Sequence, residues 1–334
     1  GIPHIKGKTD ADAVFGMIYA QAEDDFNRVE TNFINAQGRL AEAEGESAIW
    51  RDLRMKLFID PAELKADYAR APGWLKTLCV AWAEALNTYL AKHPEVKPRV
   101  ITRFEPWMAL SFSEGSIGGD IESINLARLE AFYTGQPAKL SAVELGSELE
   151  EPAGSNGMAL APSRSTSGDA LLLINPHTSF YFRSEAKVES GQGLDAYGAS
   201  TWGQFFVYQG FNRHTGWMHT SSGVDNIDEF ALTVEKKGGA WHYLHGTTWK
   251  PLKEKTISVP YRTADGTMTS RSFTTWRSHH GPVIRAENGK WIAVALMHRP
   301  VAALEQSFLR TKTTDLASYL KVASRRANSS NATL

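Results

Sequence analysis

The sequence lacks several features that would assign it to a class at once. It has a single cysteine, Cys79, so an internal disulfide is excluded and the redox compartment stays open. No apolar run reaches the roughly 18 residues of a membrane-spanning helix. The 36 basic and 37 acidic residues give a formal net charge of −1, which favours neither nucleic acid nor an anionic membrane as a partner. With 42% hydrophobic residues in a chain of 334, we expect a globular protein of one large or two smaller domains.

Both ends of the sequence have the residue pattern of a β-strand. The stretch Gly1-Ile2-Pro3-His4-Ile5 is typical of the inside of a strand, and Asn331-Ala332-Thr333-Leu334 is typical of the beginning of another. No signal peptide is present. We therefore expect both ends to lie inside a longer chain.

The periodicity of the sequence changes along its length. Residues 1–134 are mainly helical in pattern, residues 135–154 form a linker rich in Gly, Pro, Ser and Glu, and residues 155–334 contain short strands with turn signals. The predicted helices cover residues 13–40, 74–90, 121–132 and 315–327, and the predicted strands cover 170–174, 204–211, 256–261, 270–276 and 291–297. A helical half followed by a strand-rich half predicts an α+β fold with helices layered on sheet.

Ser155 lies at the boundary between the linker and the strands, in Ala153-Gly154-Ser155-Asn156-Gly157. A serine hydroxyl needs a base to become a good nucleophile. If the chain cut itself before Ser155, the new α-amine, with a pKa of roughly 7.7–8.0, would supply that base. Gly154 tolerates the strained backbone that an N→O acyl shift requires. The alternative is an ordinary loop serine, because Gly-Ser pairs are common.

Several blocks in order resemble the penicillin acylase family of N-terminal nucleophile (Ntn) hydrolases. The stretch from Ser155 to Asn175-Pro176-His177 resembles the start of the family's β-chain. Four blocks resemble the family's α-chain: Gly1–Ile5, Asp12-Ala13, Tyr19–Asp24 and Gly38–Glu42. Three later blocks also resemble the family: Trp217–Ser221, Asp225–Asp228 and His280–Ile284. The resemblance spans nearly all of the chain and implies the four-layer αββα Ntn-hydrolase sandwich.

The resemblance implies four catalytic residues. Ser155 is the nucleophile, and His177 matches the neighbouring position that orients the hydroxyl or contacts the reacting group. Ser221 matches the residue whose backbone N–H enters the oxyanion hole, and Asn331 matches the asparagine whose side-chain amide completes it. Asn328 competes with Asn331 for that role. A buried structural histidine and a helix-end asparagine are the alternatives.

The resemblance also implies a structural calcium site. Its ligands are Asp225, Asp228, the backbone carbonyl of Ile227 and Glu122 from the helical region, which are oxygen donors of the kind calcium prefers. A solvated acidic turn is the alternative. No organic cofactor is expected.

Two further groups of residues receive a structural interpretation. The histidines after residue 200 show no His-Glu-x-x-His spacing, and we interpret them as scattered strand residues: His214, His219, His242, His245, His279, His280 and His298. An aromatic cluster in and just before the predicted strand 204–211 is interpreted as core or pocket wall, and because strand neighbours alternate faces, half of it could line an acyl pocket: Trp202, Phe205, Phe206, Tyr208 and Phe211.

The predicted function is hydrolysis of an N-acyl amide by an acylase that becomes an α/β heterodimer after self-cleavage at Gly154-Ser155. The expected substrate is a small molecule. The resemblance implies aliphatic acyl chains, because the position of His177 is a histidine in many aliphatic acylases of the family, and quorum-signal degradation and β-lactam deacylation both stay open. The resemblance implies a periplasmic or secreted bacterial protein, with neither nucleic acid nor membrane as a partner.

The sequence joins Ser155 to Gly154, so it is either an uncleaved precursor or two processed chains written as one. The rival predictions are a non-catalytic binding or scaffold protein with the acylase fold, and a metal-dependent hydrolase that uses the histidines.

Overall fold

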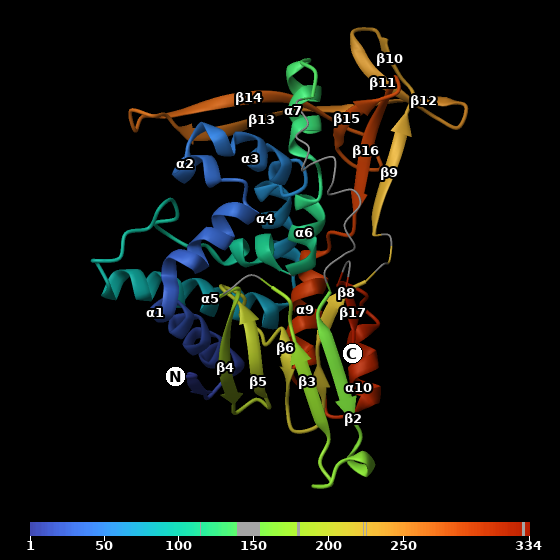
Figure 1. Ribbon diagram of the computed structural model, residues 1–334. Helices are drawn as coiled ribbons and strands as arrows, with labels where there is room; N and C mark the ends of the chain where they lie inside the picture. Colours follow the sequence, from blue (N-terminus) through green and yellow to red (C-terminus); the bar gives the residue numbers. More distant parts are fainter. Residues whose placement is uncertain (114, 139–153, 179–180, 223, 225, 329–330) are drawn as a thin grey trace.

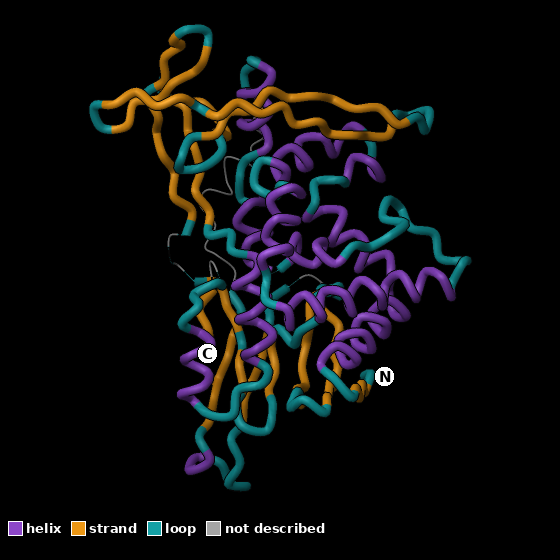
Figure 2. Tube along the Cα trace, turned by 180° about the vertical axis from the view of Figure 1, so that it is seen from behind, coloured by secondary structure: helices purple, strands orange, loops and turns teal. Residues whose placement is uncertain are grey.

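The computed structural model describes residues 1–334 apart from 114, 139–153, 179–180, 223, 225 and 329–330. Helices of the first region lie between two strand-rich parts, one below them and one above them in Figure 1. The view from behind in Figure 2 shows the same arrangement. Within the described residues, no helix is both long enough and apolar enough to cross a membrane.

Two long helices form the centre of the first region, α1 (Asp10–Ala36) and α5 (Gly73–Lys92). A capping box begins α1: the Thr9 hydroxyl accepts from Asp12 N, and the Asp12 carboxylate accepts from Thr9 N. The two helices bury their apolar faces together, with the rings of Phe33 and Trp82 4.8 Å apart. Trp82 Nε1 donates to the carbonyl of Gly203 at 2.8 Å, which ties α5 to the strand-rich region.

The remaining helices of the first region lie between this pair and the upper strands in Figure 1. They are α2 (Leu40–Glu44), α3 (Ile49–Lys56), α4 (Pro61–Arg70), α6 (Gly115–Glu122) and α7 (Leu126–Thr134), with 3₁₀ turns η1 (Glu46–Ala48) and η2 (Pro106–Phe112).

A five-stranded sheet lies against α1. Its strands, in spatial order, are β1 (His4–Gly7), β4 (Arg183–Ser190), β5 (Asp195–Thr201), β6 (Gln209–Phe211) and β7 (Gly216–Trp217). Strand β1 runs parallel to β4 and the other pairs are antiparallel. The first residues of the chain therefore complete a sheet built from the second half, and one buried core contains residues of both regions.

Two short antiparallel pairs lie beside this sheet and position the candidate site. Strand β2 (Asn156–Leu160) pairs with β3 (Leu171–Asn175), and β8 (His219–Ser221) pairs with β17 (Asn331–Thr333). The connection between β2 and β3 contains η4 (Pro162–Arg164). A Cβ atom on Gly157 of β2 would lie 2.5 Å from Met218 Sδ, so the two pairs are packed closely together.

The upper part of the molecule in Figure 1 is a set of hairpins. A three-stranded sheet has the order β15 (Val283–Glu287), β16 (Lys290–Leu296), β9 (Ile227–Leu232), and a second has the order β10 (Val234–Lys237), β11 (Ala240–His245), β12 (Thr248–Pro251). The long hairpin of β13 (Lys253–Arg262) and β14 (Met268–Arg277) extends over α2 and α3. Trp50 of α3 and Phe273 of β14 have ring centroids 5.0 Å apart.

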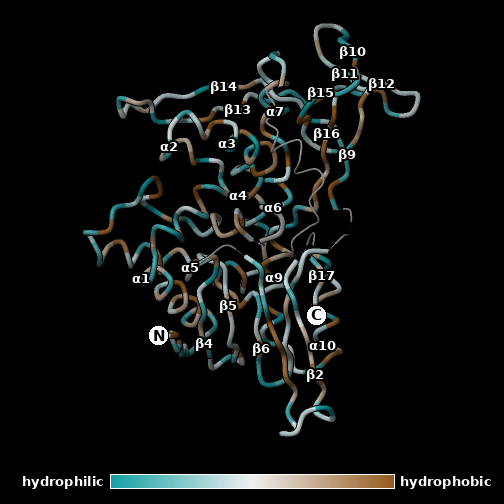
Figure 3. Tube along the Cα trace, in the orientation of Figure 1, coloured by the Kyte–Doolittle hydropathy of each residue, from teal (hydrophilic) through white to brown (hydrophobic). Residues whose placement is uncertain are grey.

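Two helices lie between β16 and β17 in the sequence, α9 (Pro300–Arg310) and α10 (Leu316–Ala323). Helix α9 contacts α4 and η2 of the first region. Helix α10 keeps Leu316 and Leu320 exposed, at 70% and 57% of their surface. Hydrophobic stretches along α10 and the β2–β3 pair are brown in Figure 3.

Several predicted elements differ from the observed ones. The predicted strand 204–211 is wrong over residues 204–208: only Gln209–Phe211 forms a strand, and the preceding residues form a buried irregular segment with bends. Strand alternation therefore does not apply to its aromatic residues. Trp202, Phe205, Phe206 and Tyr208 are buried in the core, and Phe211 is 48% exposed. The predicted linker 135–154 follows the end of α7 at Thr134, and its residues 139–153 lie outside the described part of the chain.

Candidate active site

Ser155 is positioned by the strand that begins directly after it. Asn156, the first residue of β2, is the register partner of Asn175, the last residue of β3. The hairpin thus returns the chain so that His177 comes back beside Ser155, and the His177 backbone N–H donates to Ser155 Oγ at 3.1 Å. Two residues 22 positions apart are in hydrogen-bond contact because of strand pairing.

The His177 ring faces two asparagines rather than the Ser155 hydroxyl. His177 Nε2 lies 3.0 Å from Asn175 Oδ1 and 3.2 Å from Asn156 Nδ2. A protonated Nε2 donates to Asn175, whereas an unprotonated Nε2 accepts from Asn156. The hydroxyl is therefore held by the backbone of His177, and the ring is held by the ends of β2 and β3.

The two predicted oxyanion-hole residues lie opposite each other. Ser221 and Asn331 are register partners in the β8–β17 pair. Gly154 lies against the same strand, because a Cβ atom on Gly154 would be 3.0 Å from Thr220 Oγ1. The structure thus brings Gly154 and the strand carrying Ser221 together. Asn328 lies before β17, and its Oδ1 accepts from Gln306 Nε2 at 3.0 Å.

A buried polar cluster supports Asn331, and sequence reasoning did not find it. Asn331 Nδ2 donates to Tyr208 Oη at 3.1 Å. The Tyr208 ring packs on His219, with centroids 4.8 Å apart, and the Arg183 guanidinium lies 4.7 Å from the Tyr208 ring centroid. His219 Nδ1 is 2.9 Å from Thr333 Oγ1. We refer to Arg183, Tyr208 and His219 as the Tyr208 cluster.

The Tyr208 cluster keeps His219 neutral. Burial holds the pKa of His219 well below its usual value, and the positive charges of Arg310 and Arg183 lower it further. His219 Nε2 is buried and has no hydrogen-bond partner among the described residues. The neutral His219 ring packs against the Tyr208 ring and lies within hydrogen-bond distance of Thr333 of β17.

The predicted calcium ligands are described in part. Asp225 lies outside the described residues. Ile227 and Asp228 begin β9, where Asp228 pairs with Ala295 of β16. Glu122 ends α6, which packs against β16, and Glu122 Oε1 accepts from Asn35 Nδ2 at 2.7 Å. Glu122 and Asp228 therefore lie on elements that both contact one strand, and their donors are oxygen atoms, which suits calcium.

The interpretation of the histidines as scattered is wrong for three of them. One ligand nitrogen from each of His245, His279 and His280 lies within 4.8 Å of the others. Burial lowers the pKa of His279 and of His280, and neighbouring histidines and Lys250 lower both further. His214, His219, His242 and His298 do not belong to this group.

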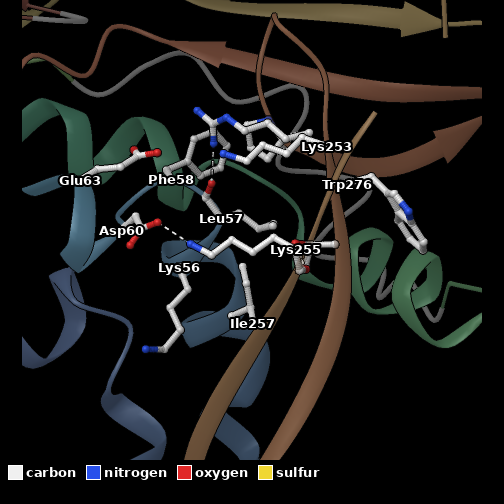
Figure 4. A pocket seen from close by; sticks show the side chains of 12 residues that line it. Lys56, Leu57, Phe58, Asp60, Glu63, Lys253, Lys255, Ile257 and Trp276 are labelled. Atoms are coloured by element: carbon white, nitrogen blue, oxygen red, sulfur yellow. Dashed lines mark hydrogen bonds and ion pairs between the residues drawn. The ribbon is translucent and has the colours of Figure 1, made fainter. Parts of the chain in front are cut away.

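A small pocket separate from Ser155 lies where the loop before α4 meets the β13–β14 hairpin (Figure 4). Asp60 forms an ion pair with Lys255 there, and Arg277 donates to the carbonyl of Leu57 at 3.0 Å. Lys56, Lys253 and Glu63 also line it. These polar contacts join the helical region to the hairpin, and the charged lining does not suit an acyl chain.

Comparison with known proteins gives the family. The model of the family described as penicillin amidase matches residues 1–334. The chain belongs to the penicillin amidase family. Family membership, with the observed helices and sheets, confirms the predicted α+β class and the resemblance on which the αββα prediction depends.

The similar curated proteins are bacterial acylases. Acyl-homoserine lactone acylase PvdQ of Pseudomonas putida is 25% identical over 312 residues, which cover 85% of this chain and 40% of the relative. Acyl-homoserine lactone acylase QuiP of Pseudomonas aeruginosa is 26% identical over 305 residues, covering 76% of this chain and 36% of the relative. The chain thus spans about 40% of the length of the first relatives it matches.

A solved structure, thermostable penicillin G acylase from Alcaligenes faecalis, is also similar. It shares 19% sequence identity at a TM-score of 0.45, over 52% of this chain and 31% of that chain.

Proposed function

We propose that the protein containing this chain is an amidohydrolase that cleaves N-acyl amides with Ser155 as an N-terminal nucleophile. The proposal rests on the residues that the strand pairs bring together around Ser155. His177 N–H donates to Ser155 Oγ, and the preceding Gly154 lies against the strand that ends in Ser221, the partner of Asn331. Membership of the penicillin amidase family supports the same chemistry.

The first step is release of the nucleophile. The Ser155 hydroxyl attacks the Gly154 carbonyl carbon, the C–N bond to Ser155 breaks, and the resulting ester is hydrolysed by water. The products are a carboxylate at Gly154 and a free α-amine at Ser155. The Thr220 hydroxyl lies against Gly154, which positions a polar group beside the bond that breaks. The α/β heterodimer follows from this cleavage.

Turnover then uses the same serine. The α-amine of Ser155 accepts the hydroxyl proton while Oγ attacks the amide carbonyl of the substrate. The Ser221 N–H and Asn331 Nδ2 donate to the oxyanion, each contributing a few kcal/mol. The intermediate collapses, the amine leaves with the proton, and the acyl group stays on Oγ as an ester. Water, deprotonated by the α-amine, hydrolyses this ester and restores the serine.

The acyl-homoserine lactones are the substrate class that we propose first. Relatives matched over most of this chain are named acyl-homoserine lactone acylases. Deacylation of β-lactams is the second candidate, favoured by the family description penicillin amidase. Comparing kcat/KM for N-acyl homoserine lactones of several chain lengths with those for penicillin G and penicillin V separates the two. We also propose a periplasmic or secreted location, because the relatives are bacterial acylases.

We propose that calcium binds between α6 and β9, with the Glu122 and Asp228 carboxylates and the Ile227 carbonyl among its ligands and Asp225 completing the set. The ion would stabilise the packing of these elements on β16. Chelation should therefore lower the melting temperature more than it lowers kcat, and Asp228→Asn should remove this calcium dependence. Equal melting curves with and without calcium would contradict the site.

The Ser155→Ala variant tests the proposed function. It should show neither self-cleavage by intact mass spectrometry nor amidase turnover. Ser165→Ala is the matched control, because Ser165 lies in the connection between β2 and β3, away from the ends of the two strands, and contacts Ser167, at 2.9 Å. Amidase activity in the Ser155→Ala protein would refute the mechanism. Failure of the wild-type protein to self-cleave or form an acyl-enzyme would favour the scaffold alternative.

A further inference from the structure

Three histidines from two separate segments meet in the upper part of the molecule. His245 ends β11, whereas His279 and His280 lie in the turn that links β14 to β15. The ring centroids of His245 and His279 are 4.6 Å apart, and those of His279 and His280 are 3.8 Å apart. We refer to these residues as the His245 cluster.

The backbone explains why consecutive histidines can share a face. Neighbouring residues of a strand point to opposite faces, but His279 and His280 occupy a turn closed by a hydrogen bond from Ser278 N to the Gly281 carbonyl at 2.9 Å. Ser278 Oγ accepts from His280 N at 3.1 Å. The turn releases the two side chains from strand alternation.

The neighbours of the His245 cluster fix the two turn residues. His279 Nδ1 lies 2.5 Å from Oη of Tyr243, which is 2% exposed. The His280 ring stacks on Phe230 of β9 with centroids 3.6 Å apart. With its proton on Nδ1, His279 donates to Tyr243 and presents Nε2 as a free lone pair, the arrangement by which second-shell groups orient metal-binding histidines.

We propose that His245, His279 and His280 bind a divalent transition-metal ion of the zinc class. Tetrahedral zinc with Zn–N bonds of about 2.0–2.1 Å needs nitrogen atoms roughly 3.4 Å apart, and the three here are already within 4.8 Å of one another. The adjustment is small because His245 and His279 are exposed side chains. Three imidazoles without a carboxylate suit zinc, copper or nickel and do not suit calcium or magnesium.

The ion would add a link between segments that already meet through the hydrogen bond between Tyr243 and His279 and through the packing of the His245 ring on the His279 ring. His245 belongs to the β10–β11–β12 sheet, and the turn leads into β15 of the neighbouring sheet. Binding would therefore stabilise the arrangement of the two sheets. Lys250 is a positive group near the cluster, so its charge opposes the bound cation.

Zinc titration against a chromophoric chelator, on protein without a histidine tag, tests the proposal. The wild type should bind one Zn²⁺ per chain and melt at a higher temperature with it. His245→Gln and His280→Gln each remove a ligand and should weaken binding by more than the roughly 10- to 100-fold that loss of a second-shell partner costs. His242→Gln is the matched control, because His242 lies on the same strand but on the face opposite His245. It should bind zinc like the wild type.

Two further variants sharpen the result. Lys250→Met should tighten zinc binding, and Tyr243→Phe should weaken it without changing the stoichiometry. The Ser155→Ala protein should bind zinc as the wild type does, so this result does not depend on the proposed acylase chemistry. Absence of zinc binding in the wild type, or an equal loss in His242→Gln, would overturn the proposal.

Discussion

Adding one methyl group at Gly281 should break the turn that carries His279 and His280. A Cβ atom at this position would lie 1.7 Å from the carbonyl oxygen of Val294 and 2.7 Å from its carbon. Both are backbone atoms of β16, and Val294 is 1% exposed. Ordinary van der Waals contact begins at 3.4 Å, so the turn and the strand must move apart by more than an ångström.

One hydrogen bond within the turn and one between the turn and β16 set the size of the effect on stability. Ser278 N donates to the Gly281 carbonyl at 2.9 Å, and Val294 N donates to the Pro282 carbonyl at 3.0 Å. A buried backbone group left without a partner costs about 1–3 kcal/mol. Loss of both bonds should therefore reduce the free energy of unfolding by roughly 2–6 kcal/mol.

Urea unfolding followed by tryptophan fluorescence measures this change. Gly119→Ala is the matched control: a Cβ there meets nothing within 4 Å, and alanine in a helix gains up to about 1 kcal/mol over glycine. The control should be as stable as the wild type or more stable. A Gly281→Ala protein whose free energy of unfolding stays within about 0.5 kcal/mol of the wild type would refute the reasoning, because that is the size of an ordinary surface substitution.

Three other predictions concern the candidate active site and the core. Asn331→Ala should lower kcat by about 10²- to 10³-fold, whereas Asn328→Ala should affect melting temperature more than kcat; the reverse pattern would exchange their roles. His219 has a lowered pKa in the folded state, so the unfolded state binds more protons below about pH 6.5 and stability should fall as pH falls through that range. His219→Gln should flatten the dependence of melting temperature on pH between 7 and 5, and parallel curves would contradict this. Phe33→Ala removes a ring 1% exposed and in contact with Trp82, and calorimetry should show a loss of about 3–5 kcal/mol.

The sequence predicted those helices and strands that are marked by the spacing of nearby apolar residues and by flanking turn residues. The helix expected over 74–90 is α5, Gly73–Lys92, because its apolar residues recur at helical spacing and Pro72 and Pro94 flank it. The pairs β13–β14 and β15–β16 also include predicted strands, and each has turn residues between its strands. Ser155 became a candidate because a predicted linker and a strand pattern meet there and because the stretch after it resembles the start of the family's β-chain.

The sequence could not predict features that depend on distant pairing. The run 204–208 is apolar enough for a strand, but its backbone is irregular and bent. Side chains hold this segment and the residue before it: Gly203 N donates to Gln21 Oε1 at 2.6 Å, and Ser200 Oγ donates to the Phe206 carbonyl at 2.6 Å. Helix α9 was missed, although Pro300 occupies its first turn. The contact between Tyr208 and Asn331 joins residues 123 positions apart, and no local spacing signals it.

The geometry around Ser155 depends on the register of two strand pairs. The β2–β3 register brings His177 N–H to the Ser155 hydroxyl, and the β8–β17 register places Asn331 opposite Ser221. A slip of one residue in either pair would turn the partner side chains to the other face. The His245 cluster is assembled by different strands, β11 and the turn after β14. The proposed zinc would therefore stabilise the upper sheets and leave the register at Ser155 unchanged, so the proposed cleavage after Gly154 should be as complete in the His245→Gln protein as in the wild type.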